Sequence, residues 1–338
     1  MLSSAIDTLL DRTIAPGYGN VGLAVRRRLP GWPADPPRMD GAVVLVTGAA
    51  AGLGLAAAEG FARLGASVRV LGRNEARAAA AAEAVARAVP GAEVTPEACD
   101  LSSLGAIQVF ARDFRGRERR LDVLVNNAGV MPPERTRSAD GHELTFATHV
   151  LAPFALTALW AEWLGRNAPA RVINVSSGGM YTQALRVEDP QSEQDEYSPK
   201  TFYARSKRQE VVLTGMWAAR LKGTGVVVHA MHPGWADTEG VQDAMPIFRR
   251  VTGPILRTPQ EGADTIVWLG AAPEALRSTG RFWQDRRPRP THYRLGAGSE
   301  TEADRRRLWD YCCGLLEAAG ISEGAALRRS ELPTPAAS

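Results

Sequence analysis

The chain has 338 residues, 45% of them hydrophobic, so it is long enough to bury a large core as one α/β domain. Its formal net charge of +3 is too small to favour nucleic-acid binding. No apolar run reaches the ~18 residues of a membrane span, and the first residues lack a signal-peptide pattern. Three cysteines, Cys99 and the adjacent Cys312 and Cys313, give no disulfide framework. We therefore expect a cytoplasmic protein, and we assign no metal ligands.

Strand-like and helix-like segments alternate between residues 41 and 285. The strand-like segments are 42–47, 67–71, 92–96, 122–125, 171–175, 226–230 and a short one near 280–283. The helix-like segments are 52–64, 75–89, 103–115, 142–166, 201–222 and 259–270. This alternation predicts a doubly wound parallel sheet with helices on both faces, which is a three-layer α/β/α arrangement of the Rossmann kind.

Two extensions flank this domain. Residues 1–40 hold an apolar-patterned stretch, then three arginines at 26–28 and Trp32. Such a segment could pack as a strap or form a partly ordered tail, and its cations beside Trp32 leave open a membrane-surface contact through residues 20–33. Residues 286–338 contain a helix-like run at about 302–319, which we expect to dock on the domain or on a neighbouring subunit. The last dozen residues look disordered.

The first motif is a glycine loop over residues 47–54, with Gly48, Gly52 and Gly54. It follows an apolar strand-like run and leads into a helical pattern. Glycines let a backbone approach a pyrophosphate closely, and a helix N-terminus offers unpaired N–H groups and a positive dipole end. Strand, glycine turn and helix in this order predict a dinucleotide site.

A second motif pairs Tyr203 with Lys207. Positions i and i+4 share one face of a helix, so the phenol and the ammonium point into the same space. A cation beside a phenol favours its ionised form, which lets the pair exchange a proton near neutral pH. The pair is therefore a candidate general acid and base.

With three further motifs, the chain resembles the short-chain dehydrogenase/reductases. The motifs that carry the resemblance are Thr47–Gly54, Asn126–Gly129, Val175–Gly178, Tyr203 with Lys207, and His232–Thr238. The resemblance covers about residues 40–285. Three stretches, at 176–180, 231–238 and 280–286, are most similar to the dehydrogenase/reductase member twelve group within that family.

The resemblance implies a nicotinamide cofactor and a catalytic set. The residues it places at the cofactor are Thr47, Gly48, Gly52, Leu53, Gly54, Arg73, Asp100, Leu101, Asn127, Ala128, Gly129, Tyr203, Lys207, Pro233, Gly234 and Thr238. Tyr203 would exchange the proton, Lys207 would hold the ribose, and Ser177 would orient the substrate oxygen, with Ser176 as the alternative.

The end of the second strand bears on the choice of cofactor. The family's NAD-selecting acidic residue is replaced here by Gly72, and Arg73 follows. An arginine suits the 2′-phosphate of NADP, although it could also be a solvated loop residue. The loop positions Ala49–Ala51 lack the family's other basic determinant, so NAD remains the alternative. Asp100 matches the adenine-contacting acidic residue, and it could equally cap the next helix.

One departure from the family concerns the proton relay. His149 stands where the family has an asparagine that holds a relay water. An imidazole could hold that water or relay the proton itself, or it could fill the relay site and lower activity. Both interpretations stay open.

These patterns favour an NADP-dependent carbonyl reductase or alcohol dehydrogenase. The alternative is an NADP(H)-binding scaffold or redox sensor with little turnover, and a surface-bound lipid-modifying enzyme is a weaker third. Trp235, Met245, Ile247 and Phe248 follow the Pro-Gly turn and suggest an apolar small-molecule substrate. A homo-oligomer remains open, and no nucleic-acid partner is expected.

Overall fold

The protein is a three-layer α/β/α structure, seen here in a computed structural model that describes residues 2–237, 252–293 and 298–329. Eight strands form one sheet in the order β3-β2-β1-β4-β5-β6-β7-β8. They are β1 (Val43–Thr47), β2 (Ser67–Gly72), β3 (Val94–Ala98), β4 (Val123–Asn126), β5 (Ala170–Val175), β6 (Val226–Met231), β7 (Phe282–Gln284) and β8 (Arg287–Arg289). The first seven run parallel, so the predicted doubly wound parallel sheet is confirmed.

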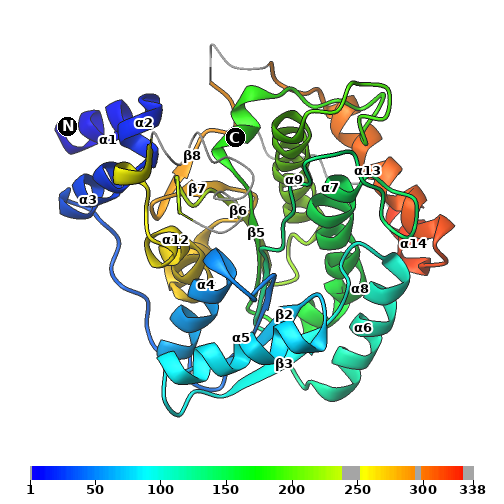
Figure 1. Cartoon of the computed structure of the whole chain (residues 1–338), viewed down its shortest axis with the longest axis horizontal. Helices are drawn as coiled ribbons and strands as arrows, with labels where there is room; N and C mark the ends of the chain where they lie inside the picture. The colour runs from blue at the N-terminus through cyan, green and yellow to red at the C-terminus, as the bar shows by residue number, and fades with distance from the viewer. Residues whose placement is uncertain (1, 238–251, 294–297, 330–338) are drawn as a thin grey trace.

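Helices cover both faces of this sheet (Figure 1). On one face lie α4 (Gly52–Arg63), α5 (Glu75–Ala88) and α12 (Pro259–Ala271), packed through one buried cluster that includes Phe61, Val85 and Ile266. On the other lie α6 (Leu104–Arg117), α8 (Ala152–Arg166) and α9 (Pro199–Arg220). Outside this second layer pack α13 (Glu302–Ala318) and α14 (Ser322–Arg329), and Trp309 of α13 contacts Trp217 of α9. The helix α9 is therefore covered on two sides.

The helical segment predicted at 142–166 is interrupted near its start. It consists of α7 (Leu144–Phe146), a π-helical turn η1 (Ala147–Leu151) and α8. The ring of Pro153 would clash with the His149 carbonyl in a regular α-helix, and the wider turn accommodates it. This segment, Leu144–Arg166, is long and apolar enough to cross a membrane, but 83% of its most apolar window is buried inside the fold, as in a core helix.

Several elements escaped sequence analysis. β8 lies beyond Asp285, so the sheet extends into the segment assigned to the C-terminal extension. The N-terminal extension forms α1 (Leu2–Arg12), α2 (Ile14–Tyr18) and α3 (Asn20–Arg28). Short 3-10 turns occur at η2 (Gly178–Thr182), η3 (Gly253–Ile255) and η4 (Pro273–Arg277). Of the last dozen residues, 327–329 are helical, so the prediction of disorder is wrong for them, and 330–338 lie outside the described residues.

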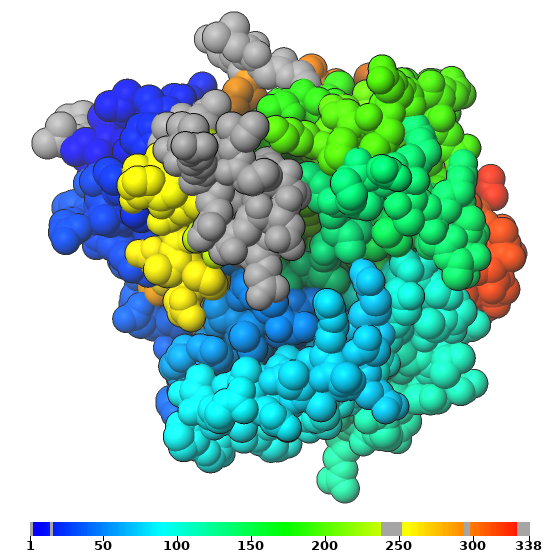
Figure 2. Space-filling view, in the orientation of Figure 1, coloured from blue at the N-terminus to red at the C-terminus, as the bar shows by residue number. Residues whose placement is uncertain are grey.

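The N-terminal helices pack on the domain. In the space-filling view they lie against the segment near residues 252–260 (Figure 2). Arg26 is fully buried and pairs with Asp7 at 2.9 Å and Asp285 at 2.6 Å. The guanidinium of Arg286 lies over the Trp32 ring, 5.1 Å from its centroid. Because Arg26 is buried in these ion pairs, the prediction that it belongs to a membrane-surface patch is wrong. These contacts favour a strap packed on the domain.

Candidate active site

The motif residues gather at one edge of the sheet. In the parallel register Asn126 pairs with Asn174, and Val175 pairs with Met231, so these strands end side by side. The segments that follow β1, β4, β5 and β6 therefore meet at the carboxyl edge, and they carry the four loop motifs. Ligands of doubly wound sheets bind at this edge, where the strand order reverses between β1 and β4.

Hydrogen bonds lock the glycine loop to the segment after β4. The Thr47 hydroxyl accepts the N–H groups of Asn127 at 2.9 Å and Ala128 at 3.0 Å. In return the Asn127 amide donates to the Thr47 carbonyl at 3.0 Å and the Gly48 carbonyl at 3.3 Å. Two segments separated by some 80 positions in the chain thus form one rigid wall of the site.

The loop leaves a helix N-terminus open. The residue before α4 is Ala51, which provides no side-chain cap, so the first N–H groups of this helix lack that partner. Gly48 has φ of +64°, and a Cβ there would lie 2.7 Å from Ala128 Cα. A Cβ on Gly54 would lie 2.3 Å from the Gly48 carbonyl oxygen. Bare backbone and a positive dipole end fit a pyrophosphate group.

The adenosine end of the predicted site is basic. Arg73 is exposed and makes no ion pair within the described residues. A Cβ on Gly72 would lie 2.8 Å from the Ala78 nitrogen, so α5 occupies the place of an acidic side chain. The Asp100 carboxylate accepts the Ser102 N–H at 3.0 Å, and Leu101 is buried beside it. Asp100 does not cap α6, because Ser103 is the N-cap residue.

The two serines after β5 differ in their bonding. The Ser176 hydroxyl is buried and donates to the Lys207 carbonyl at 3.0 Å. The Ser177 hydroxyl is half-buried and accepts the Gly179 N–H at 3.1 Å. Across the described ranges, the Ser177 proton has no acceptor. Ser177 is therefore the serine that can donate to a ligand.

Tyr203 and Lys207 lie on one face of α9 as their spacing predicts. The Lys207 ammonium lies 5.9 Å from the centroid of the Tyr203 ring. It donates to the Val175 carbonyl at 2.8 Å and to Glu210 at 3.1 Å. The Tyr203 ring is half-buried and meets the His149 ring edge to face at 5.3 Å.

His149 is held by two hydrogen bonds inside the protein. Its Nε2 accepts the Val130 N–H at 2.8 Å, and its Nδ1 lies 2.8 Å from the Ser206 hydroxyl. Ser206 donates its own proton to the Tyr203 carbonyl, so Nδ1 carries the hydrogen and the ring is neutral. Burial, with help from the Lys207 charge, moves the pKa of His149 well below its usual value. The lowered pKa and the two hydrogen bonds argue against a histidine relay that titrates near neutral pH.

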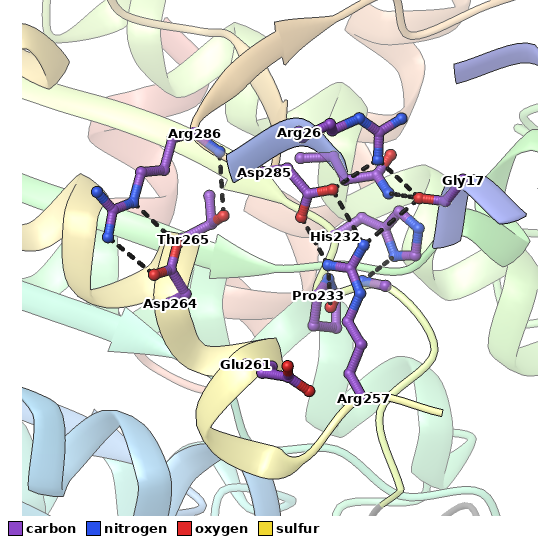
Figure 3. A network of polar contacts seen from close by, with 12 residues as sticks. Gly17, Arg26, His232, Pro233, Arg257, Glu261, Asp264, Thr265, Asp285 and Arg286 are labelled. Carbon is purple, nitrogen blue, oxygen red and sulfur yellow. Dashed lines mark hydrogen bonds and ion pairs between the residues drawn. The ribbon is translucent and has the colours of Figure 1, made fainter. Parts of the chain in front are cut away.

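The Pro233-Gly234 turn depends on a buried ion network (Figure 3). Arg257 donates to the Pro233 carbonyl at 3.1 Å and pairs with Asp285 at 2.6 Å. Asp285 also pairs with Arg26, which donates to the Gly17 carbonyl at 2.7 Å. The N-terminal extension thereby supports the turn. Thr238 and the apolar residues Met245, Ile247 and Phe248 lie outside the described residues.

Sequence analysis missed Glu210, Arg257 and Asp285 as site-supporting residues. Glu210 lies three positions after Lys207, a spacing at which helical side chains meet, and this signal could have revealed it. The partners of Arg257 and Asp285 come from distant segments, so no local pattern indicates them.

Comparisons with known proteins agree with this geometry. A sequence profile described as short chain dehydrogenase matches residues 42–246. Dehydrogenase/reductase SDR family member 12 of Bos taurus is 39% identical over 272 residues, which are 80% of this chain and 85% of that protein. Retinol dehydrogenase 14 of Mus musculus is 35% identical over 292 residues, 82% of this chain and 86% of that protein. A variant of actinorhodin polyketide ketoreductase solved with NADPH superposes with a TM-score of 0.57, at 25% identity, covering 71% of this chain and 94% of that one.

Proposed function

The chain belongs to the short-chain dehydrogenase/reductase family, and on that premise we propose that it is an NADP-dependent carbonyl reductase or alcohol dehydrogenase. The observation that carries the proposal is the meeting of Tyr203, Lys207 and Ser177 with the glycine loop at one sheet edge. The family's nicotinamide cofactor, when bound, supplies or accepts the hydride. A cytoplasmic location remains part of this proposal.

Different residues of this chain would bind different parts of the nicotinamide cofactor. The glycine loop and the N-terminus of α4 would hold the pyrophosphate, and Asn127, Ala128 and Gly129 would line the opposite wall. Asp100 and Leu101 would lie at the adenine, and Pro233, Gly234 and Thr238 at the nicotinamide. Arg73 would pair the 2′-phosphate.

Three side chains would carry the proton chemistry. Ser177 donates its free proton to the substrate oxygen and orients it. Tyr203 exchanges a proton with that oxygen as negative charge develops on it. The Lys207 ammonium, fixed by the Val175 carbonyl, stabilises the phenolate that forms when Tyr203 gives up its proton.

We propose an apolar carbonyl or alcohol as the substrate. Retinol dehydrogenase 14 is named for an apolar alcohol, and it shares 35% identity with this chain. Purified protein with NADPH and a panel of apolar and polar aldehydes and ketones tests both statements. Oxidation of NADPH with apolar members supports them, and no turnover with any member favours the scaffold.

Cofactor choice should depend on Arg73. In Arg73→Ala, affinity for NADPH should fall roughly 10- to 100-fold, because a charge-assisted hydrogen bond to phosphate is lost. Affinity for NADH should hardly change. Fluorescence titration of both cofactors measures this, and Arg87→Ala, an exposed change in the last turn of α5, is the matched control. Equal affinity of the wild type for both cofactors would contradict the choice of NADP.

His149→Asn should affect stability more than the pH dependence of the rate. Asparagine is too short to reach both Val130 and Ser206, so the free energy of unfolding should fall by about 1–3 kcal/mol. The acid side of the pH–rate profile should keep its shape, because His149 is already neutral there. Urea unfolding and initial rates across pH measure the two effects. Loss of an acid limb in the variant would instead restore the histidine relay.

A further inference from the structure

A buried ion pair lies directly behind the proposed proton donor. Lys207 Nζ and Glu210 Oε2 are 3.1 Å apart, and the two side chains are only 3% and 2% exposed. The ammonium has three hydrogens, of which Glu210 and the Val175 carbonyl each take one. One hydrogen is left for the side of Lys207 that faces the Tyr203 ring.

The groups around Glu210 are few and mostly uncharged. Lys207, on the same helix, is the charged neighbour, and Ser176, the residue directly after β5, places its hydroxyl beside Glu210. From η1, His149 faces Lys207 and is neutral. His229 of β6 does not face Glu210, because its ring is bonded to Ala275 and Trp283 on the opposite face of the sheet.

These surroundings let Glu210 change its protonation state near neutrality. Burial raises the pKa of Glu210 to about 7, against the opposing effects of the Lys207 charge and the Ser176 hydroxyl. A carboxylate deep in a protein is costly even when paired, so a proton is readily held there. Because one hydrogen bond already joins Glu210 to Lys207, a proton can pass between them without rearrangement.

The relay position of the family does not offer another source of the proton that Lys207 needs. In the family pattern the position of His149 serves the relay, but both ring nitrogens of His149 are used by Val130 and Ser206. Within the described residues, Glu210 is the carboxyl group in direct contact with Lys207.

We propose that Glu210 is a positioning residue for Lys207 that also stores the proton exchanged by Tyr203; this inference rests on the proposed function. In reduction, the substrate carbon receives the hydride, and the O–H bond of Tyr203 breaks as its proton joins the substrate oxygen. The phenolate then takes a proton from the Lys207 ammonium through a bridging water or hydroxyl. The Lys207 amine takes the carboxyl proton of Glu210, and solvent later returns one proton to Glu210. Oxidation runs through the same steps in reverse.

The first test is the pH–rate profile of Glu210→Gln. Glutamine keeps the shape and one acceptor for Lys207 but cannot titrate. Wild-type reduction should slow as pH rises above about 7, because Glu210 then lacks its proton. In Glu210→Gln this alkaline limb should vanish, and the rate below the limb should be roughly 10- to 100-fold lower. Glu210→Asp, which keeps an ionisable group, should retain the limb.

The second test needs no substrate or cofactor. Because the pKa of Glu210 is raised from 4.5 to about 7, the folded state binds a proton more tightly than the unfolded state. The resulting stability is fully present below pH 4.5 and is lost as pH rises through 7. Urea unfolding across this range should show the loss in wild type and not in Glu210→Gln. Glu97→Gln, another buried glutamate, paired with Arg117 at the β3 edge of the sheet, is the matched control and should keep the wild-type slope.

The outcomes separate this inference from the proposed function. If wild type turns over a substrate and its pH profile is identical to that of Glu210→Gln, the role of Glu210 is overturned. The proposed function is then still supported. If wild type turns over no carbonyl compound, the proposed function fails, and the unfolding slopes alone decide whether Glu210 stores a proton. Should Glu210→Gln not fold, wild type with isotope-labelled glutamate carboxyl carbons should show one resonance titrating near neutral pH. The absence of such a resonance overturns the inference.

Discussion

Replacing Tyr203 by phenylalanine should lower turnover by about 100-fold or more on a confirmed substrate, because the hydroxyl that exchanges the proton is gone. The ring remains, so its edge-to-face contact with His149 should persist. Cofactor affinity and thermal stability should therefore stay near those of wild type. Steady-state kinetics, with a fluorescence titration of NADPH, separates the two effects.

A matched control lies on the far side of α9. Tyr311 of α13 accepts a hydrogen bond from Gln191 at 2.6 Å and is not part of the site. Tyr311→Phe should leave turnover unchanged. Near-normal turnover in Tyr203→Phe would show that another group supplies the proton, and the assignment of the acid would have to be abandoned.

The strands and the motif loops could be predicted because local signals fix them. Val43–Thr47 is a fully buried run with glycines directly after it, and both features are visible in sequence. Parallel strands bring their carboxyl ends to one edge, so the order of the motifs was enough to place them together. The η1 turn was not predicted, because Pro153 is compatible with either a helix start or a widened turn.

The environment of α9 could not be predicted from its sequence. The helix is covered by the sheet on one side and α13 on the other, so five consecutive polar residues are buried. They are Ser206, Lys207, Arg208, Gln209 and Glu210. A run of this composition normally indicates a solvated face. The depth of Glu210 and the engagement of both His149 nitrogens depend on partners that only the fold brings together.

The N-terminal extension was ambiguous for the same reason. The arginine cluster beside Trp32 suits either a charged surface or buried pairs, and the choice depends on acidic partners far away in the chain. Asp285 lies 259 positions from Arg26. Its role in the site could not be read from the local sequence, although it decides how the extension meets the Pro233-Gly234 turn.

Asp285→Asn should lower the free energy of unfolding by about 3–5 kcal/mol at neutral pH, because two buried guanidinium groups lose their shared carboxylate. Burial acts to raise the pKa of Asp285, but the charges and hydrogen bonds of Arg257 and Arg26 hold it below its ordinary value. The stabilisation should therefore be present above the ordinary pKa of 3.8 and be lost as pH falls through the lower, folded-state value. Urea unfolding at neutral and acidic pH measures this, and the variant should lack the acid dependence.

The network should also behave as one unit. Arg26 and Arg257 share Asp285, so Arg26→Gln and Asp285→Asn together should destabilise the protein by less than the sum of the two single changes. Asp40→Asn, which removes an exposed partner of Arg38, is the control and should change stability little. Because Arg257 also holds the Pro233 carbonyl, NADPH affinity should fall in Asp285→Asn but not in Asp40→Asn. Additive destabilisation with unchanged affinity would mean that the extension packs beside the turn without supporting it.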